Sequence, residues 1–401
     1  MWREGARRLL DKGQILVLAL GHAVVDGYAA FLAPLWPLLM SRFDLSLRMV
    51  GLLISALSLS GSMMQPVYGY ISDRMGRRTL LMVGPVVAGV FTGIIGLTSH
   101  RMVFVVFILL ASIGINAYHP QAVSMTGRIK GRRKAFYMAL FINIGGIGYG
   151  LGPMIATTFV GAYGLERLFY LSVPGLLMAW LLYRWAPPAL EVDTRLSIKA
   201  DLKDTFRTGW RALGRLYLIA SVRAAVSIGF MNFLPLFFKE RSLSLIQGGR
   251  LISVFLLAGA AGGLVGGYLS DYVDRRRFLM GSLAVSSPLF LLVLSAAGHR
   301  FFPLLLFTVG FVYASSFPAN VVMAQETASR NVSTVSAFVM GFAWGTGGLI
   351  AGLFSSIAEA YSLLAALQGL AFLPLVAAGL AFRLSRETEV AREQRLECKE
   401  V

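Results

Sequence analysis

The sequence predicts an all-α membrane protein of twelve transmembrane helices, arranged as two pseudo-symmetric six-helix bundles. Three observations carry this prediction: the composition, a series of long apolar runs, and an internal repeat. The 401 residues are 56% hydrophobic and only 14% charged, with a mean hydropathy of +0.69, whereas soluble domains carry about 25% charged residues. This excess of apolar side chains is expected to face lipid.

Apolar runs of about 20 residues recur along the chain, and each is long enough to cross a hydrocarbon core of about 30 Å as a helix. Stretches such as 104–110 are apolar on every face, which favours helices over the alternating strands of a β-barrel. The first run is too long and too polar for a cleaved signal peptide. We place the spans, in order, at 14–40, 47–71, 79–98, 101–125, 133–162, 166–186, 213–238, 245–270, 277–298, 300–326, 332–358 and 361–384.

An internal repeat relates the two halves of the chain. The segments 69–78 and 267–276 both read Gly-Tyr-x-Ser-Asp and end in Arg-Arg, and the offset of 198 residues between them is close to half the chain. Six helices per half give parallel repeats, whose substrate site lies between the halves near the midplane. We therefore expect an N-terminal bundle at 1–186, a cytoplasmic linker at 187–212, a C-terminal bundle at 213–384 and a cytoplasmic tail at 385–401.

Lys and Arg gather in alternate loops, including 74–78, 128–134 and 275–277, while the intervening loops hold few. The positive-inside rule then places both termini in the cytoplasm of a multi-pass protein of the bacterial inner (plasma) membrane. Because these loops account for the net charge of +17, no nucleic-acid partner is expected. The single cysteine, Cys398, cannot form an internal disulfide.

Taken together, the Gly-x-x-x-Asp-Arg-x-Gly-Arg-Arg pattern at 69–78, its weaker copy at 267–276 and the two sets of six helices resemble the major facilitator superfamily over nearly the whole chain. Within it, the segments 22–27, 118–122, 233–236 with Arg223, and 321–326 resemble the fosmidomycin-resistance group of efflux proteins. Gln121 departs from that group, where an acidic residue is usual. The resemblance implies the major facilitator fold and transport by alternating access rather than enzyme activity.

The resemblance also implies a gate in the short connection between the second and third spans. In family members the aspartate of this motif pairs with a basic residue and a helix N-terminus, and an acidic group there gains about 0.3–1 kcal/mol when exposed. The alternative is an ordinary positively charged loop. The predicted gate residues are Gly69, Asp73, Arg74, Gly76, Arg77, Arg78 and, in the second half, Asp271.

Glycines three to four residues apart at 145–152 allow close contact between helices in lipid. Their Gly-x-x-x-Gly-Pro core resembles the family's antiporter motif, which is associated with proton-coupled efflux, although Ala156 stands where a further glycine is usual. Plain helix packing is the alternative. The glycines at 341–352 are expected to play the mirror part in the second half.

Ionisable residues inside spans carry most weight, because a charge at the bilayer centre costs about 2.5–3.5 kcal/mol. His22 and Asp26 lie four apart, hence on one helix face. The repeat offset places Arg223 at nearly the depth of Asp26, which predicts an electrostatic pair across the transport path. The alternative is an ion pair that only fixes the packing of the two halves.

The predicted proton-coupling residues are Asp26, His22, His119 and Glu326. Histidine titrates near neutrality, and Pro120 loosens the helix next to His119. Packing histidines, and an interfacial charge at Glu326, are the alternatives. The predicted substrate-binding residues are Arg223, Tyr28, Gln65, Asn116, Asn143, Asn232, Asn320 and Trp344, because such pockets combine apolar walls with a few polar groups. Trp36 and Trp185, near span ends, are predicted interfacial anchors.

No metal cluster at ligand spacing and no phosphate-binding loop is evident, so we expect no cofactor and take the proton gradient as the energy source. The sequence thus favours a monomer in the lipid bilayer that exchanges protons for a small organic molecule or drug and exports it. The alternative is uptake or exchange of an organic anion held by Arg223. A membrane sensor would need an appended signalling domain, and an intramembrane enzyme would need a nucleophile beside His119.

Overall fold

The computed structural model describes residues 2–75, 77–127, 134–186, 210–327 and 335–384, and all regular secondary structure in this part of the chain is helical. Within the described residues, eleven stretches are long and apolar enough to cross a membrane, and the shorter apolar segment Leu47–Ser62 supplies the twelfth crossing. The prediction of a twelve-helix, all-α membrane protein is therefore confirmed.

Each half of the chain contributes six crossings, some of them built from two helical pieces. The first six are α1 (Trp2–Ala29) with α2 (Leu32–Phe43), α3 (Leu47–Met75), α4 (Arg77–Gly93) with η1 (Ile94–Leu97), α5 (Arg101–Gly127), α6 (Lys134–Tyr163), and η2 (Leu165–Ser172) with α7 (Val173–Trp185). The last six are α9 (Trp210–Glu240), α10 (Leu245–Leu269), α11 (Arg275–Ser295), α12 (Phe302–Ser315) with α13 (Phe317–Thr327), η3 (Ala337–Phe342) with α15 (Ala343–Ala360), and α16 (Leu363–Phe382).

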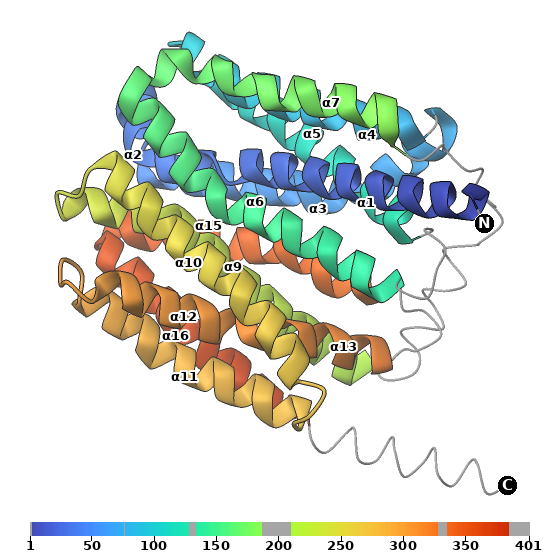
Figure 1. The fold of residues 1–401 in the computed structure, drawn as a ribbon. Helices are drawn as coiled ribbons and strands as arrows, with labels where there is room; N and C mark the ends of the chain where they lie inside the picture. Colours follow the sequence, from blue (N-terminus) through green and yellow to red (C-terminus); the bar gives the residue numbers. More distant parts are fainter. Residues whose placement is uncertain (1, 76, 128–133, 187–209, 328–334, 385–401) are drawn as a thin grey trace, which may run out of the picture.

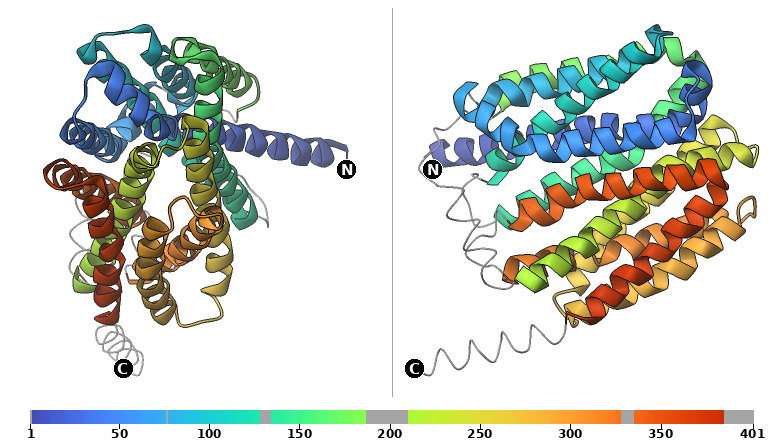
Figure 2. Two further views of the ribbon diagram at one scale, coloured as in Figure 1. Left: turned by 90° about the vertical axis from the view of Figure 1, so that its left-hand side faces the viewer. Right: turned by 180° about the vertical axis from the view of Figure 1, so that it is seen from behind.

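The helices of the first half, blue to green, gather on one side of the molecule, and those of the second half, yellow to red, gather on the other (Figure 1). Seen along the helices, the two groups lie side by side with α6 and α10 crossing near the middle (Figure 2). Helix α1 begins and α16 ends at the same end of the molecule. Most of the predicted linker, and the whole predicted tail, fall outside the described residues.

Among the described crossings, non-helical residues interrupt two, the first between α1 and α2 and the tenth between α12 and α13, and prolines explain both breaks. Proline lacks an N–H group, and its ring clashes with the carbonyl four residues earlier. Pro34 follows the break between α1 and α2, and Pro318 follows the break between α12 and α13. Each break lies next to an ionisable side chain, since Asp26 stands one turn before the first and Arg223 contacts the second.

The two bundles meet through small residues. One interface joins α3 to α15, where Ser55 donates a hydrogen bond to the carbonyl of Gly348 at 3.3 Å. A Cβ atom on Gly348 would lie only 2.1 Å from the Oγ atom of Ser58, so only glycine fits there. The second interface joins α6 to α10, where Ser253 accepts a hydrogen bond from the backbone N–H of Met154. Close approach through small residues is how helices associate in lipid.

Side-chain contacts also tie the bundles together at the end of the molecule away from the chain's first residue. The indole N–H of Trp36 donates to Oδ1 of Asn232 at 2.7 Å, and Glu359 accepts a hydrogen bond from the backbone N–H of Arg48. Trp36 is fully buried, so its prediction as an interfacial anchor is wrong: the α1–α2 break turns α2 toward α9. Trp185 is exposed, as expected of an anchor.

Candidate functional site

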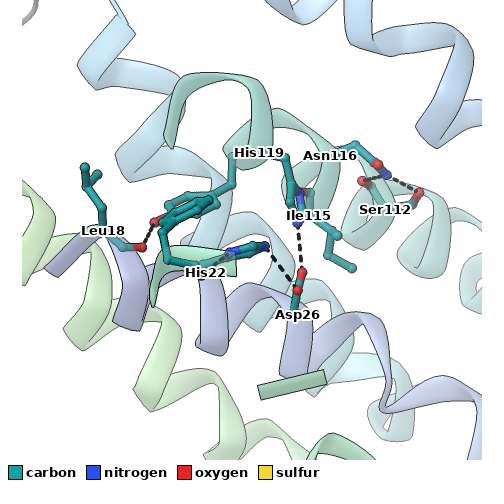
Figure 3. A network of polar contacts seen from close by, with 9 residues as sticks. Leu18, His22, Asp26, Ser112, Ile115, Asn116 and His119 are labelled. Atoms are coloured by element: carbon teal, nitrogen blue, oxygen red, sulfur yellow. Dashed lines mark hydrogen bonds and ion pairs between the residues drawn. The ribbon is translucent and has the colours of Figure 1, made fainter. Parts of the chain in front are cut away.

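The first bundle holds a compact group of ionisable side chains within the membrane. Nε2 of His119, on α5, lies 2.8 Å from Oδ1 of Asp26 on α1, and Nε2 of His22 lies 3.2 Å from Oδ2 of the same carboxylate. Figure 3 shows both imidazoles converging on Asp26. Sequence reasoning named these three residues and placed two of them on one face, but it did not place His119 against them. We call them the His–Asp–His cluster.

The other ring nitrogen of each histidine is held by the backbone. Nδ1 of His119 lies 2.8 Å from the carbonyl of Ile115, one turn earlier on α5 (Figure 3). Nδ1 of His22 lies 3.0 Å from the carbonyl of Phe141 on α6. A carbonyl can only accept a hydrogen bond, so both Nδ1 atoms carry a hydrogen, and both Nε2 atoms are left to face Asp26.

Helix α6 shapes the pocket around His22. The ring of Phe141 stacks on the imidazole, with ring centroids 4.3 Å apart, and Gly145 leaves the space that the imidazole fills. Nearby on α5, the hydroxyl of Tyr118 donates to the carbonyl of Leu18 on α1 at 2.5 Å. Phe141, Gly145 and Tyr118 were not predicted as parts of the site. The glycine spacing of α6 was the available signal for Gly145, but it also fits plain packing.

The glycines of α6 lie on two faces of the helix, one against α1 and one against α10. A Cβ atom on Gly148 or Gly152 would strike α1, at Ala23 and Gly27 respectively, whereas one on Gly150 would strike Leu257 of α10 in the other bundle. In α15, Gly345, Gly348 and Gly352 face α3, while Gly347 faces α9. Each of these helices thus packs closely against one neighbour in its own bundle and one in the other.

The cluster is largely buried without being sealed. The exposed fraction of the side chain is 11% for His22, 17% for Asp26 and 29% for His119. The sequence showed no metal cluster, yet these three residues bring possible ligand atoms within 4.8 Å of one another. The direct contacts between the imidazoles and the carboxylate have hydrogen-bond lengths, so the group is arranged to hold protons between its own members.

Arg223 occupies the second bundle and has neutral partners. Its guanidinium donates to the Oγ atom of Ser316 at 3.0 Å and to the carbonyl of Tyr313 at 2.6 Å. It also lies over the rings of Tyr313 and Phe317, at 4.9 and 5.9 Å from their centroids. The residue is buried, and its Nε atom has no hydrogen-bond partner among the residues that the structure describes. The break between α12 and α13 thus supplies the guanidinium with polar groups.

Asp26 and Arg223 do not pair with each other in this structure, contrary to the expectation from the repeat. Among the described residues, the ion pairs of Asp26 are with His22 and His119, and Arg223 forms none. The repeat offset fixes the depth of a residue in its helix but not the direction in which its side chain points. Arg223 points into its own bundle, toward α12 and α13.

The predicted gate is described in the second bundle. Arg275 lies between two carboxylates, with NH2 at 3.0 Å from Asp271 and NH1 at 2.6 Å from Glu326 at the end of α13. Glu326 therefore lies in this network and apart from the His–Asp–His cluster. Asp274 accepts a hydrogen bond from the backbone N–H of Arg277 and so caps α11.

In the first bundle, the connection between the second and third spans is shorter than expected. Helix α3 continues to Met75 and α4 begins at Arg77, so the predicted loop shrinks to a single residue between helices. Gly76 lies outside the described residues. Gly69, Asp73, Arg74 and Arg77 are described only by their places in helices α3 and α4. Arg78 is described, and its guanidinium donates to the carbonyl of Tyr183 at the end of α7.

The remaining predicted substrate residues are scattered rather than gathered around one site. Tyr28 is buried and ties α1 to the last crossing of its bundle through Leu171 and Gly175. Asn116 and Asn143 each donate to a carbonyl one turn earlier. Asn232 bonds Trp36 across the bundles. Asn320 is fully buried, Trp344 is exposed, and the side chain of Gln65 lies outside the described residues.

Two six-crossing bundles with buried ionisable groups in the membrane define a secondary transporter. The sequence matches the model of the Major Facilitator Superfamily over residues 18–352, and the chain belongs to this family of transporters; it is not an enzyme. It is 26% identical to the fosmidomycin resistance protein of Escherichia coli (strain K12), over 91% of each chain. It is 25% identical to a protein of Cupriavidus necator described as a probable sulfoacetate transporter, SauU, over 69% of this chain and 68% of that one.

Solved structures show the same fold at low sequence identity. A bacterial homologue of the human lysosomal transporter Spinster, in an inward-facing and unoccupied conformation, matches with a TM-score of 0.72 and 17% identity, over 94% of this chain and 97% of that chain. The nucleoside transporter NupG matches with a TM-score of 0.73 and 14% identity, over 94% of this chain and 98% of that chain.

Proposed function

We propose that this protein is a proton-coupled antiporter that exports a small organic molecule by alternating access of its two bundles. The observation that supports this best is the His–Asp–His cluster: three titratable side chains in mutual contact, mostly buried and inside the membrane. Such residues are costly in a bilayer and mark ion and proton pathways. Histidine changes charge near neutral pH, which suits a site that is loaded on one side of the membrane and unloaded on the other.

The fold supplies a means of linking this cluster to movement. Asp26 lies one turn and His22 two turns before the break in the first crossing, and α2 beyond the break bonds Asn232 of the other bundle through Trp36. His119 joins α1 to α5 through Asp26. A change of protonation therefore acts on the helix that connects directly to the second bundle. We take residues 1–186 and 213–384 as the two moving bodies, with both termini in the cytoplasm.

The substrate class is suggested by Arg223. A buried cation without a carboxylate partner among the described residues favours an anionic ligand, since an unpaired buried charge is expensive. The names of two relatives point the same way: fosmidomycin is a phosphonate, and sulfoacetate carries a sulfonate and a carboxylate. Exchange or uptake of an organic anion by the same fold is therefore the second candidate function, and it differs from the first in direction and in proton dependence.

Flux through proteoliposomes tests the proposal. With labelled fosmidomycin as the probe and the purified protein inserted in both orientations, an imposed pH gradient should drive accumulation of the probe in the more acidic compartment. Asp26→Asn should abolish this gradient-driven accumulation while leaving probe exchange at equal pH intact, because it removes the negative charge on which both imidazoles converge without changing the shape of the side chain. His299→Gln serves as a matched control, because His299 is exposed and lies in the turn before α12.

Three outcomes separate the candidates. Accumulation of the probe in the more acidic compartment, opposite to proton flow, supports antiport if it is lost in Asp26→Asn and kept in His299→Gln. Accumulation in the direction of proton flow indicates symport and favours uptake. Full gradient-driven accumulation by Asp26→Asn would show that the aspartate is structural, and the proposal would fail in its central point.

A further inference from the structure

We infer that the His–Asp–His cluster is a two-proton site, which takes up and releases two protons with His22 and His119 as the separate acceptors. The inference rests on the proposed function in one respect, that protons are the coupling ion. It goes beyond it by fixing how many protons the site holds and which atom holds each one.

The first step is the direction of the hydrogen bonds at Nδ1. Phe141 and Ile115 present backbone carbonyls to His22 and His119, at 3.0 and 2.8 Å. Carbonyl oxygens accept and never donate, so each Nδ1 atom must keep its hydrogen for these bonds to exist. In the neutral form of such an imidazole, Nε2 has no hydrogen and is itself an acceptor.

The second step is the pair of contacts at Nε2. Each Nε2 atom faces its own oxygen of Asp26, at 3.2 Å for His22 and 2.8 Å for His119. An ionised carboxylate is only an acceptor, so two bare lone pairs would oppose each other in both contacts. Each contact becomes a hydrogen bond only when a proton lies between its two atoms. The described geometry, with both contacts formed, therefore holds two protons beyond those on Nδ1.

The charge balance follows from these protons. With neither proton, the cluster has the single negative charge of Asp26; with one it is neutral; with two it has one net positive charge, as two imidazolium ions share one carboxylate. On release, the Nε2–H bond breaks, its electron pair stays on Nε2 as the ring lone pair, and the proton passes to water. The side chain of His119 is 29% exposed, the largest exposed fraction of the three.

The other titratable groups around Asp26 leave this count unchanged. Tyr118 on α5 and Tyr149 on α6 are within electrostatic reach of the carboxylate. The hydroxyl of Tyr118 donates to Leu18, and that of Tyr149 donates to Met231. Tyrosine hydroxyls titrate near pH 10 in water, so both stay neutral at physiological pH. Among the described residues, no Lys or Arg forms an ion pair with Asp26.

The two protons have different structural consequences. The proton at His119 joins α5 to α1, so its release removes a bond between two helices. The proton at His22 lies between residues of one helix, so its release changes the charge of the cluster without separating helices. The structure thus assigns the proton whose release separates α5 from α1 to His119. It assigns the proton whose release changes only the charge of the cluster to His22.

Nitrogen NMR of the full-length protein in lipid nanodiscs tests the inference. The chain has only four histidines, and the two outside the cluster, His100 and His299, are exposed, so ¹⁵N-histidine labelling gives a spectrum that His→Gln variants can assign. Between about pH 4 and about pH 9, both His22 and His119 should pass from imidazolium to the neutral form protonated at Nδ1. A chelator in all samples excludes bound metal ions.

Proton counting gives an independent readout. Wild-type protein should release two more protons over this range than His22→Gln/Asp26→Asn/His119→Gln, a variant in which the buried carboxylate cannot titrate in place of the imidazoles. In the Asp26→Asn background, each single His→Gln variant should release one more proton than this triple variant. His299→Gln, the matched control, should lose only the proton of an exposed histidine. The inference is overturned if only one cluster histidine titrates, if either neutral ring carries its hydrogen on Nε2, or if the triple variant differs from wild type by one proton.

These outcomes are separate from those of the flux measurement. Two titrating histidines in a protein without proton-driven flux would uphold the two-proton site and remove the proposed function. Proton-driven flux in a protein whose cluster releases a single proton would do the reverse.

Discussion

Gly145 on α6 lies directly against the imidazole of His22 on α1. A Cβ atom at position 145 would stand 2.4 Å from both Nδ1 and Cε1 of that ring, well inside van der Waals contact. The position of His22, and with it the hydrogen bond to Phe141 and the contact to Asp26, therefore depends on the absence of a side chain on the neighbouring helix. A glycine that fits a packing motif also shapes the ionisable site.

The first prediction concerns this glycine. Gly145→Ala should displace the His22 ring and lower the free energy of unfolding by about 1–3 kcal/mol, as overpacking of a tight interior does. Gly281→Ala is the matched control, since no atom of the described residues lies within 4 Å of a Cβ atom there, and helix propensity alone should raise stability by about 0.5–1 kcal/mol. Denaturant unfolding in mixed micelles measures both. Equal effects of the two variants would show that position 145 has room.

The second prediction follows from the separate partners of the two buried charges. Because Asp26 and Arg223 bond within their own bundles, the destabilisation in Asp26→Asn/Arg223→Met should equal the sum of the single effects within about 0.5 kcal/mol. Asp26→Asn/His119→Gln should deviate from additivity, because those residues are in contact. A double-mutant cycle of unfolding free energies provides the measurement, and strong coupling between Asp26 and Arg223 would show that they pair in a populated state.

The third prediction tests Arg223 as an anion contact. Arg223→Lys keeps the charge but loses the planar fork that matches carboxylates and phosphonates, so thermal stabilisation of the protein by sulfonates and phosphonates should weaken by several-fold in apparent affinity. Neutral analogues of the same compounds are the control and should bind both proteins alike. If the variant lowers Tm without ligand yet keeps the affinity for anions, Arg223 serves only to join α9 to α12 and α13.

The fourth prediction concerns the gate. In Asp271→Asn the ion pair with Arg275 is lost, but exposed ion pairs contribute only about 0–1 kcal/mol, so Tm should change little while the rate of transport falls. Asp73→Asn, its counterpart in the repeat, should act in the same way. Asp274→Asn is the control, because Asn caps a helix as well as Asp does. Normal turnover in both Asp73→Asn and Asp271→Asn would show that these aspartates do not act as a gate.

The fifth prediction fixes the orientation in the membrane. In a Cys398→Ser background, Thr205→Cys should resist a membrane-impermeant thiol reagent added to intact cells, because its loop is rich in Lys and Arg and is expected inside. Ser99→Cys lies in the exposed turn before α5 and should react without permeabilisation. The reverse labelling pattern would place the gate motif outside the cell.

The sequence alone determined the number, length and order of the membrane crossings, because these depend on local composition and on the fixed thickness of a bilayer. It also revealed the repeat and, through the cost of charge in lipid, picked out His22, Asp26, His119 and Arg223. These are properties of short segments, and they can be read one helix at a time.

Only the tertiary structure decided which of these side chains meet. Depth along a helix follows from residue number, but the face that a side chain presents depends on helix rotation and on breaks such as those before Pro34 and Pro318. In the folded protein Arg223 points toward Ser316 and away from Asp26, and His119 on α5 contacts the carboxylate of Asp26. Small residues such as Gly145 set how closely the helices approach, and that spacing is a property of the packed bundle.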